Sequence, residues 1–160
     1  MPALTLYTIG YSGFTPSSFV ARLKSAGIEA LIDVRRNPVS RKPGFSQAGL
    51  STFLHEHGIE YVHAVTLGVP ESLRAELREG GEVGDYFAAF ARYLAGCDDA
   101  LDDVDLRARR QRCCLMCLEK RPTECHRAVV ANELKARSNG EIRVEHLLLG
   151  NETARELEFE

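Results

Sequence analysis

The stretch LTLYTIGYSGFTPSSFVARLKSAGIEALIDV, residues 4–34, decides the fold of this 160-residue chain. Residues 4–10 are an apolar, β-rich run that ends in glycine, which predicts a buried strand. Thr15 followed by Pro16 is the pattern of a helix N-cap and a first helical position, and residues 28–34 form a second β-rich run. A strand, a helix and a strand in this order predict a βαβ unit with parallel strands.

The helix of this unit is expected to be amphipathic, because Phe19, Val20 and Leu23 fall on one of its faces. Further strands are expected at 59–65, 112–118 and 142–149, and further helices at 46–58, 85–96, 98–112 and 122–140. Glycines in residues 66–84 leave room for one short helix, and a mobile flap is the alternative there. We therefore predict a three-layer α/β domain, Rossmann-like, with a mainly parallel sheet and helices on both faces.

The overall properties of the chain limit the kinds of protein that it can be. Its length suits one domain, and we expect residues 1–150 to form it, with 151–160 as a C-terminal tail or short helix. A net charge of −3 argues against a protein built chiefly to coat nucleic acid. No apolar run approaches the ~20 residues of a membrane span, and the N-terminus lacks the pattern of a signal peptide. Five cysteines, three of them within residues 113–117, do not have the spacing of a disulfide framework, so we expect a cytoplasmic protein.

Chemically distinctive residues follow the strands at one predicted edge of the sheet. Ligands of open parallel sheets bind beyond the carboxyl ends of the strands. The residues expected there are Ser12 after the first strand, Asp33, Arg35 and Arg36 after the second, Cys117 and Glu119 after the fourth, and Cys125, His126 and Arg127 at the start of the next helix. This convergence predicts a functional site, because polar residues without a shared role would be scattered.

The loop RRNPVSRK, residues 35–42, carries four cations and is stiffened by proline. Guanidinium groups bind phosphate and carboxylate through paired hydrogen bonds, so an anionic ligand is expected here. An ordinary solvated loop, whose arginines pair with surface acids, is the alternative. Asp33 is either an orienting group or general base, or a turn carboxylate. The predicted anion-binding residues are Ser12, Arg35, Arg36, Ser40, Arg41 and Arg127.

The arginine-rich segment 107–112 looks like a nucleic-acid patch, but its context favours a solvated helix. Asp103 precedes Arg107 by four residues, which is the spacing of an ion pair on one helix face. Asp105 and Arg109 repeat this spacing. Acids at the start of the helix and bases at its end also complement the helix dipole. We therefore assign this segment no binding role.

Metal binding is the first hypothesis for the cysteine-rich stretch CLMCLEKRPTECHR, residues 114–127. Its cysteines and histidine have the composition of a zinc site. However, side chains alternate between the two faces of a strand, so Cys114 and Cys117 point to opposite sides and cannot share an ion. We predict no metal and no cofactor, and we expect Cys97, Cys113 and Cys114 to be buried in the core.

Cys117 and Cys125 form a different kind of pair. One ends a predicted strand and the other lies in the first turn of the next helix, so the intervening loop could bring the two thiols together. The helix dipole, His126 and Arg127 should lower the pKa of Cys125, and thiolate is the reactive form for nucleophilic attack or disulfide exchange. Two structural thiols, with His126 capping the helix and Arg127 paired to an acid, are the alternative, and metal binding is a third reading. The predicted catalytic residues are Asp33, Cys117, Glu119, Cys125 and His126.

Several segments carry a resemblance to a known family: TIGYS at 8–12, LIDVRRNPVSRKPGFS at 31–46, LG at 67–68, CLEKRPTECHR at 117–127, and His146. Over about residues 4–149 the chain resembles the bacterial and archaeal domain-of-unknown-function family 488. The resemblance implies a compact α/β domain and no particular reaction. The positions that it implicates are Asp33, Arg35, Pro38, Ser40, Cys117, Glu119, Cys125, His126 and Arg127. Many relatives have histidine in place of Tyr11 and glycine in place of Val69, so no acid–base role is carried over to Tyr11.

We therefore expect a small enzyme that acts on an anionic substrate, a phosphate-bearing nucleotide or a nucleic-acid end, through a cysteine–histidine site. In this hypothesis Arg35, Arg41 and Arg127 hold the negative charge, and His126 is the acid–base partner of a thiol. The same pocket without covalent chemistry would be an anion- or nucleic-acid-binding module, which is the alternative hypothesis. No membrane partner is expected, and the sequence leaves the oligomeric state open.

Overall fold

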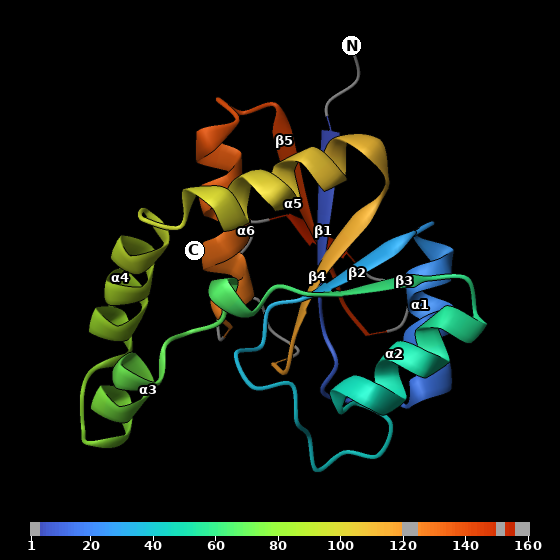
Figure 1. Ribbon diagram of the computed structural model, residues 1–160, viewed down its shortest axis with the longest axis horizontal. Helices are drawn as coiled ribbons and strands as arrows, with labels where there is room; N and C mark the ends of the chain where they lie inside the picture. Colours follow the sequence, from blue (N-terminus) through green and yellow to red (C-terminus); the bar gives the residue numbers. More distant parts are fainter. Residues whose placement is uncertain (1–3, 120–124, 150–152, 156–160) are drawn as a thin grey trace.

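The computed structural model of the chain describes residues 4–119, 125–149 and 153–155, and Figure 1 shows the arrangement of its elements. The strands are β1 (Leu4–Gly10), β2 (Ala30–Asp33), β3 (Glu60–His63), β4 (Cys113–Cys117), β5 (Ile142–Leu147) and β6 (Thr153–Arg155). The helices are α1 (Pro16–Ser25), α2 (Gln47–Glu56), the 3₁₀ helix η1 (Val65–Leu67), α3 (Glu71–Arg78), α4 (Val83–Leu94), α5 (Asp98–Arg110) and α6 (His126–Arg137).

The described strands form one sheet in the order β3-β2-β4-β1-β5-β6. Strands β1 to β5 are parallel, and β6 pairs antiparallel with β5. The centre of the sheet is β4, where Met116 lies opposite Ile9 of β1 and Cys114 lies opposite Leu31 of β2. The predicted α/β fold with a mainly parallel sheet is confirmed.

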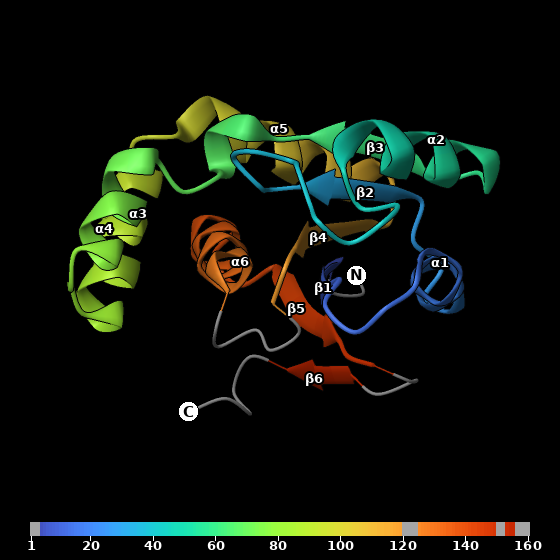
Figure 2. The same cartoon turned by 90° about the horizontal axis from the view of Figure 1, so that it is seen from below.

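Helices cover both faces of the sheet, because the side chains of each strand alternate between the faces. On one face, Phe19 of α1 and Leu50 of α2 belong to the same apolar cluster as Cys114 and Met116. On the other face, α4, α5 and α6 pack in a second cluster that contains Leu115. Figure 2 shows α1 and α6 on opposite sides of the central strands. The three-layer, Rossmann-like arrangement is therefore confirmed as well.

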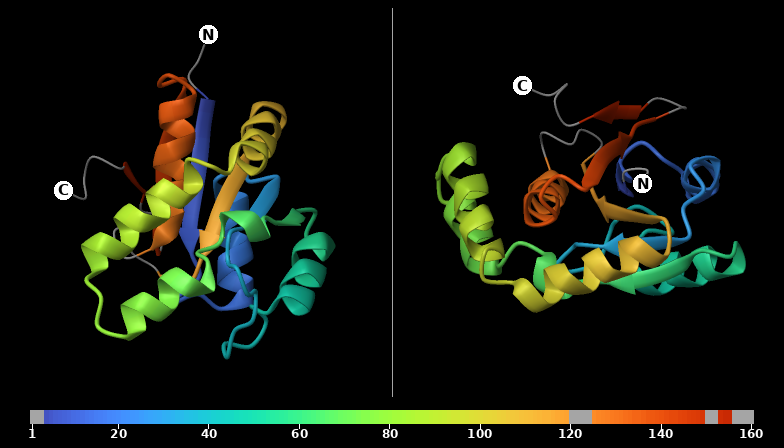
Figure 3. Two further views of the ribbon diagram at one scale, coloured as in Figure 1. Left: turned by 60° about the vertical axis from the view of Figure 1, so that its left-hand side comes forward. Right: turned by 90° about the horizontal axis from the view of Figure 1, so that it is seen from above.

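Residues 66–84 contain the one short helix that the sequence predicts, α3, and also most of η1. The helix that we expect to begin at residue 85 begins at Val83. α3 packs against α4, and α4 packs against α6, so this helix pair lies on the α6 side of the sheet (Figure 3). α4 is anchored by buried Phe90 and Leu94, whereas no residue of α3 is buried.

The C-terminal region contains α6, β5 and β6, and parts of it lie outside the described residues. α6 begins at His126 with Cys125 as its N-cap, whereas the predicted start at Pro122 lies outside the described residues. In the tail, Thr153–Arg155 is a strand and not a helix, and residues 150–152 and 156–160 lie outside the described part. None of the helices in the described ranges is both long and apolar enough to span a lipid bilayer.

Candidate functional site

The segments that leave three neighbouring strands are tied together by backbone hydrogen bonds. The Tyr11 N–H, just beyond β1, donates to the carbonyl of Cys117 at 3.0 Å. On the other side of β4, the Val34 N–H, just beyond β2, donates to the carbonyl of Met116 at 3.1 Å. The carboxyl end of β4 is therefore held between its two neighbours, and a side chain on its last residue has a fixed position.

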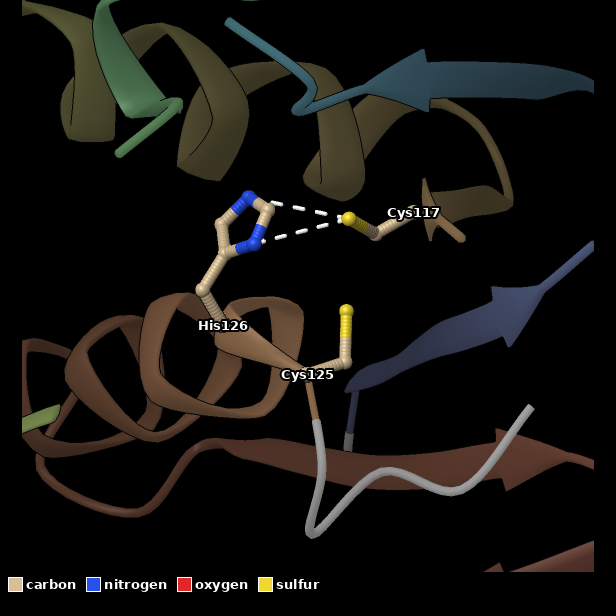
Figure 4. Close-up of side chains that lie close together, drawn as sticks. All are labelled: Cys117, Cys125 and His126. Atoms are coloured by element: carbon tan, nitrogen blue, oxygen red, sulfur yellow. Dashed lines mark hydrogen bonds between the residues drawn. The ribbon is translucent and has the colours of Figure 1, made fainter. Parts of the chain in front are cut away.

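Two cysteines and a histidine converge at this end of β4. Cys117 is the last residue of β4, Cys125 is the N-cap of α6, and His126 is the first residue of that helix. The Sγ of Cys117 lies 3.4 Å from Nδ1 of His126, and the ligand atoms of all three residues lie within 4.8 Å of one another. Figure 4 shows both sulfur atoms beside the imidazole ring. The expected proximity of Cys117 and Cys125 is therefore found in the structure.

The imidazole of His126 is oriented by a backbone carbonyl. Its Nε2 lies 2.8 Å from the carbonyl oxygen of Val34, which can only accept, so Nε2 carries a proton and donates. The other nitrogen, Nδ1, is then the one that faces Cys117. Phe90 of α4 packs edge-on against the ring, with centroids 5.4 Å apart. The ring is thus fixed in position, with Nε2 turned to Val34 and Nδ1 to Cys117, by groups outside the predicted catalytic set.

The three groups perturb one another's pKa values in opposite directions. Burial alone would raise the pKa of Cys125, but hydrogen bonds from Cys117 and His126, with the charges of His126 and Arg127, bring it well below the ordinary value. The hydrogen bond to Cys125, followed by burial, holds the pKa of Cys117 well above its ordinary value. Burial would lower the pKa of His126, but its interaction with Cys125 raises it. Cys125 is therefore the more acidic of the two thiols, and His126 beside it favours its thiolate form.

Two clefts open beside the cluster. The large cleft has a volume of about 460 Å³ and is lined by Arg74, Leu77, Arg78, Val83, Tyr86, Phe87, Glu119, Cys125 and His126. The small cleft, of about 160 Å³, shares Arg74, Tyr86, Glu119 and His126 with the large one and adds, among others, Arg35, Arg36 and Cys117. The pKa of Glu119 is raised by burial and by the negative charge of Cys125. Both clefts therefore combine the cysteine–histidine cluster with arginine side chains.

Asp33 and Arg35 form a buried ion pair. Nε of Arg35 donates to one carboxylate oxygen of Asp33 at 2.9 Å and Nη2 donates to the other at 2.7 Å, while Nη1 donates to the carbonyl of Phe45 at 2.7 Å. The Tyr61 hydroxyl also donates to Asp33, and Nε2 of His63 donates to the carbonyl of Arg35 at 2.7 Å. This network fixes the start of the 35–42 loop, and in it Asp33, one of the predicted catalytic residues, orients Arg35.

The other predicted anion-binding residues of the 35–42 loop occupy different surroundings. Arg36 lines the small cleft, and its Nη1 donates to the carbonyl of Gly68 at 3.3 Å. The Ser40 hydroxyl accepts from the Tyr11 hydroxyl at 3.0 Å, inside the loop. Arg41 is exposed and lines neither cleft. Of these cations, Arg36 is thus the one that joins Arg35 at the cluster.

Arg127 is fully buried. Its Nε donates to the Thr8 hydroxyl at 3.1 Å and its Nη1 donates to the carbonyl of Glu119, so it joins α6 to β1 and to the segment after β4. The Thr8 hydroxyl also lies 2.5 Å from Nδ1 of His146 on β5. Neither Arg127 nor Ser12, the last of the predicted anion-binding residues, lines a cleft of the cluster. Arg127 therefore holds the elements around the site together and does not line its clefts.

Sequence reasoning did not identify the α3 and α4 residues of the large cleft, chiefly Arg74, Arg78, Tyr86 and Phe87. The rings of Tyr86 and Phe87 lie 5.3 Å apart. One signal was present in the sequence: Arg74 and Arg78 are four residues apart on one face of a short helix, where like charges destabilise the helix itself. In the structure Arg78 is paired with Glu71 of the same helix, so Arg74 is the cation of this pair for which no salt bridge is found among the described residues.

The remaining cysteines lie in the core, as predicted. Cys113 and Cys114 are fully buried and belong to the clusters on opposite faces of β4. Burial raises the pKa of Cys113 to about 11 and raises that of Cys114 further. Cys97 is buried at the start of α5, and its Sγ donates to the carbonyl of Tyr93. Cys113 and Cys114 are therefore neutral packing groups at physiological pH.

The solvated-helix interpretation of residues 107–112 agrees with the structure in part. Arg109 and Asp105 form the expected ion pair on α5, at 2.9 Å. Arg107 instead pairs with Glu60 of the neighbouring strand β3, at 2.6 Å. Both pairs are at the surface, where ion pairs contribute little to stability.

The residues of the cluster fall within a region that matches a known family model. That model, described as Domain of unknown function DUF488, matches residues 15–134 and so covers Cys117, Cys125 and His126 together with Asp33 and Arg35. Comparisons with curated proteins and with solved structures gave no significant match. The match extends over most of the sequence, from the start of α1 into α6, and on this basis the chain belongs to the DUF488 family.

Proposed function

We propose that this protein is a thiol-dependent enzyme that acts on a phosphate-bearing nucleotide or a closely related anionic substrate. The observation that carries the proposal is that Cys125 and His126 line one cleft together with Arg74 and Arg78. A nucleophile, an acid–base group and cations in one cleft are what substitution at an electrophilic, anionic centre requires.

In this mechanism the Cys125 thiolate is the nucleophile. Its Sγ bonds to the electrophilic atom of the substrate, and the leaving group departs with the electron pair of the broken bond. The His126 imidazolium gives the leaving group its Nδ1 proton, because Nε2–H is held by the carbonyl of Val34. Cys117 stabilises the thiolate before attack by donating a hydrogen bond to it. Glu119, beside both groups, is suited to activate the water that releases the product from sulfur.

The surroundings of the cluster favour a nucleotide as the anion. Arg74 lines both clefts, Arg36 lines the small one, and Arg78, which is paired with Glu71 at the surface, lines the large one. Within the described residues, Arg74 takes part in no salt bridge, which leaves its guanidinium available for phosphate. Tyr86 and Phe87 offer aromatic faces against which a base can stack.

A non-catalytic anion-binding module is the second candidate. The observation that favours it is the low exposure of both thiols, 5% for Cys117 and 2% for Cys125, which limits the access of an electrophile. In such a module the arginines would hold the anion, and the cysteines would only build the wall of the cleft. The reactivity of Cys125 separates the two functions.

The enzyme hypothesis predicts that Cys125 is the cysteine alkylated fastest in the reduced, folded protein at pH 7. Replacement of His126 by alanine should slow this modification by about tenfold or more, because losing the cation returns the thiol pKa toward the ~8.5 of a free thiol, where only a few per cent is thiolate at pH 7. Mass spectrometry of peptides, after timed treatment with iodoacetamide, measures the rate at each cysteine.

The matched control for this experiment is Cys97→Ser, which removes a buried cysteine outside the cluster and leaves a good N-cap residue on α5. The rate at Cys125 should be unchanged in this variant. Modification of Cys125 no faster than that of buried Cys114 in the wild-type protein would favour the binding module.

Replacement of Arg74 by glutamine is expected to weaken the binding of adenosine 5′-monophosphate about tenfold, because it removes a charged donor of phosphate hydrogen bonds. Isothermal titration of the reduced protein measures the affinity, and adenosine serves as the uncharged reference ligand. Arg110→Gln is the matched control, since Arg110 is an exposed arginine on α5 that lines neither cleft of the cluster. Equal losses in both variants would mean that binding follows net charge and not the cleft.

A further inference from the structure

We propose that Cys117 Sγ, Cys125 Sγ and His126 Nδ1 form a binding site for one Zn²⁺ ion, with the fourth ligand position open toward the arginine-lined clefts. The inference rests on the same side chains as the proposed function and adds a regulatory state to it. In the zinc-loaded state the thiols are occupied, and in the zinc-free state they react.

The distances within the cluster match those between ligands of zinc. Tetrahedral zinc sites have Zn–S distances of about 2.3 Å and Zn–N distances of about 2.0–2.1 Å, which separates sulfur and nitrogen ligands by roughly 3.5 Å. Cys117 Sγ and His126 Nδ1 are 3.4 Å apart, and Cys125 Sγ lies within 4.8 Å of both. An ion placed between the three atoms requires only small side-chain rotations to reach bonding distance.

The second nitrogen of His126 has the partner that a zinc-bound histidine needs. Histidines that bind metal through one ring nitrogen generally donate the other N–H to a carbonyl or carboxylate, which fixes the ring and its tautomer. Here Nε2 donates to the carbonyl of Val34 at 2.8 Å, and Nδ1 is left to face the two sulfur atoms. Val34 is itself held by its backbone hydrogen bond to Met116 of β4, so the support is rigid.

The position of Cys114 explains why this site differs from the zinc set that the sequence suggests. Cys114 packs in the cluster on the opposite face of the sheet from Cys117, so a site with all three cysteines is impossible. Without Cys114, two thiolates and one imidazole remain, which is the ligand number of zinc sites that keep a position open. Glu119 and Arg74 line the clefts at that open side.

Zinc and substrate chemistry compete for the same lone pairs. The ion accepts one electron pair from each thiolate and one from Nδ1, and the protons that these atoms carry in the free protein pass to the solvent. A thiolate bound to zinc is shielded from electrophiles, and His126 can no longer give a proton through Nδ1. Removal of zinc by a thiol or chelator restores both groups, with no change of oxidation state.

A zinc titration of the whole, reduced protein tests this inference without any substrate. Competition with a chromophoric chelator should show one Zn²⁺ per chain, and His126→Ala should weaken binding by at least about tenfold, whereas Cys97→Ser should not. Co²⁺ in place of Zn²⁺ should give the near-ultraviolet absorption band of thiolate-to-cobalt charge transfer. This readout needs no variant, so it remains decisive if substitutions at buried Cys117 fail to fold.

Two results would overturn the inference: less than stoichiometric zinc, or a cobalt complex without the thiolate band. Alkylation separates this inference from the proposed function. One equivalent of Zn²⁺ should protect Cys125 in the wild-type protein, while the chelator-treated protein should react. If the thiols react but the protein binds no zinc, the enzyme hypothesis is supported and the metal site is not. If the protein binds zinc but its thiols do not react after zinc is removed, the metal site is supported and the enzyme hypothesis is not.

Discussion

Replacement of Asp33 by alanine is expected to lower the free energy of unfolding by about 3–5 kcal/mol, because it leaves the Arg35 guanidinium buried without its counter-charge. Asp33 is fully buried and Arg35 is 6% exposed, and two hydrogen bonds join them. Burial alone would lower the pKa of Arg35, but the bonds to Asp33 raise it above the ordinary value, so the guanidinium keeps its charge. The Tyr61 hydroxyl loses its acceptor in the same variant. Urea unfolding followed by circular dichroism measures the change.

The size of this effect depends on burial, and a surface pair provides the comparison. Asp105→Ala removes a carboxylate from an exposed pair with Arg109 and should cost no more than about 1 kcal/mol. In the double variant Asp33→Ala/Arg35→Met, the buried charge is gone and part of the lost stability should return. A cost for Asp33→Ala as small as that for Asp105→Ala would contradict the assignment of the pair as a buried one.

The architecture could be predicted from local patterns in the sequence. Strands β1, β2 and β4 are short, mostly apolar runs, and the helices between the strands show an apolar face, so the alternation is visible without knowing any tertiary contact. Thr15 illustrates this: it caps α1, and its hydroxyl accepts from the backbone N–H of Ser18 as the pattern predicts. The single-domain organisation and the cytoplasmic location stay predictions.

The sequence could predict those residues of the site that lie at the end of a strand or at the start of the helix that follows it. Cys117 and Cys125 meet because a strand end and the next helix start lie at the same edge of the sheet, which follows from the fold class. Arg74 could not be found in this way, because its position depends on how α3 and α4 pack beside α6. Arg35 was predicted to bind the ligand because the sequence does not show which groups its side chain contacts. Only the folded structure shows that Asp33 and the carbonyl of Phe45 occupy its donors.

Replacement of Arg127 by methionine is expected to lower the free energy of unfolding by about 2–6 kcal/mol. Methionine fills a similar volume, but the Thr8 hydroxyl and the carbonyl of Glu119 lose a buried donor, at about 1–3 kcal/mol each. The segment after β4 is held by this contact, so Cys125 should also lose part of its reactivity. Urea unfolding and the alkylation assay on the same variant measure both effects.

The pKa of His146 distinguishes two effects of the Arg127→Met substitution: the loss of the positive charge and the loss of side-chain packing. Burial, and then the charge of Arg127, lower the pKa of His146 to about 4, below its ordinary value of 6.5. Between these values the unfolded chain binds a proton that the folded protein does not, so stability should fall as the pH falls from about 6.5 to 4.

In Arg127→Met the pKa of His146, followed by NMR, should rise, and the loss of stability between pH 6.5 and 4 should become smaller. Arg143→Met, which removes an exposed cation from the same strand as His146, should leave both unchanged. An unchanged His146 pKa in Arg127→Met would mean that Arg127 supports the site by packing alone.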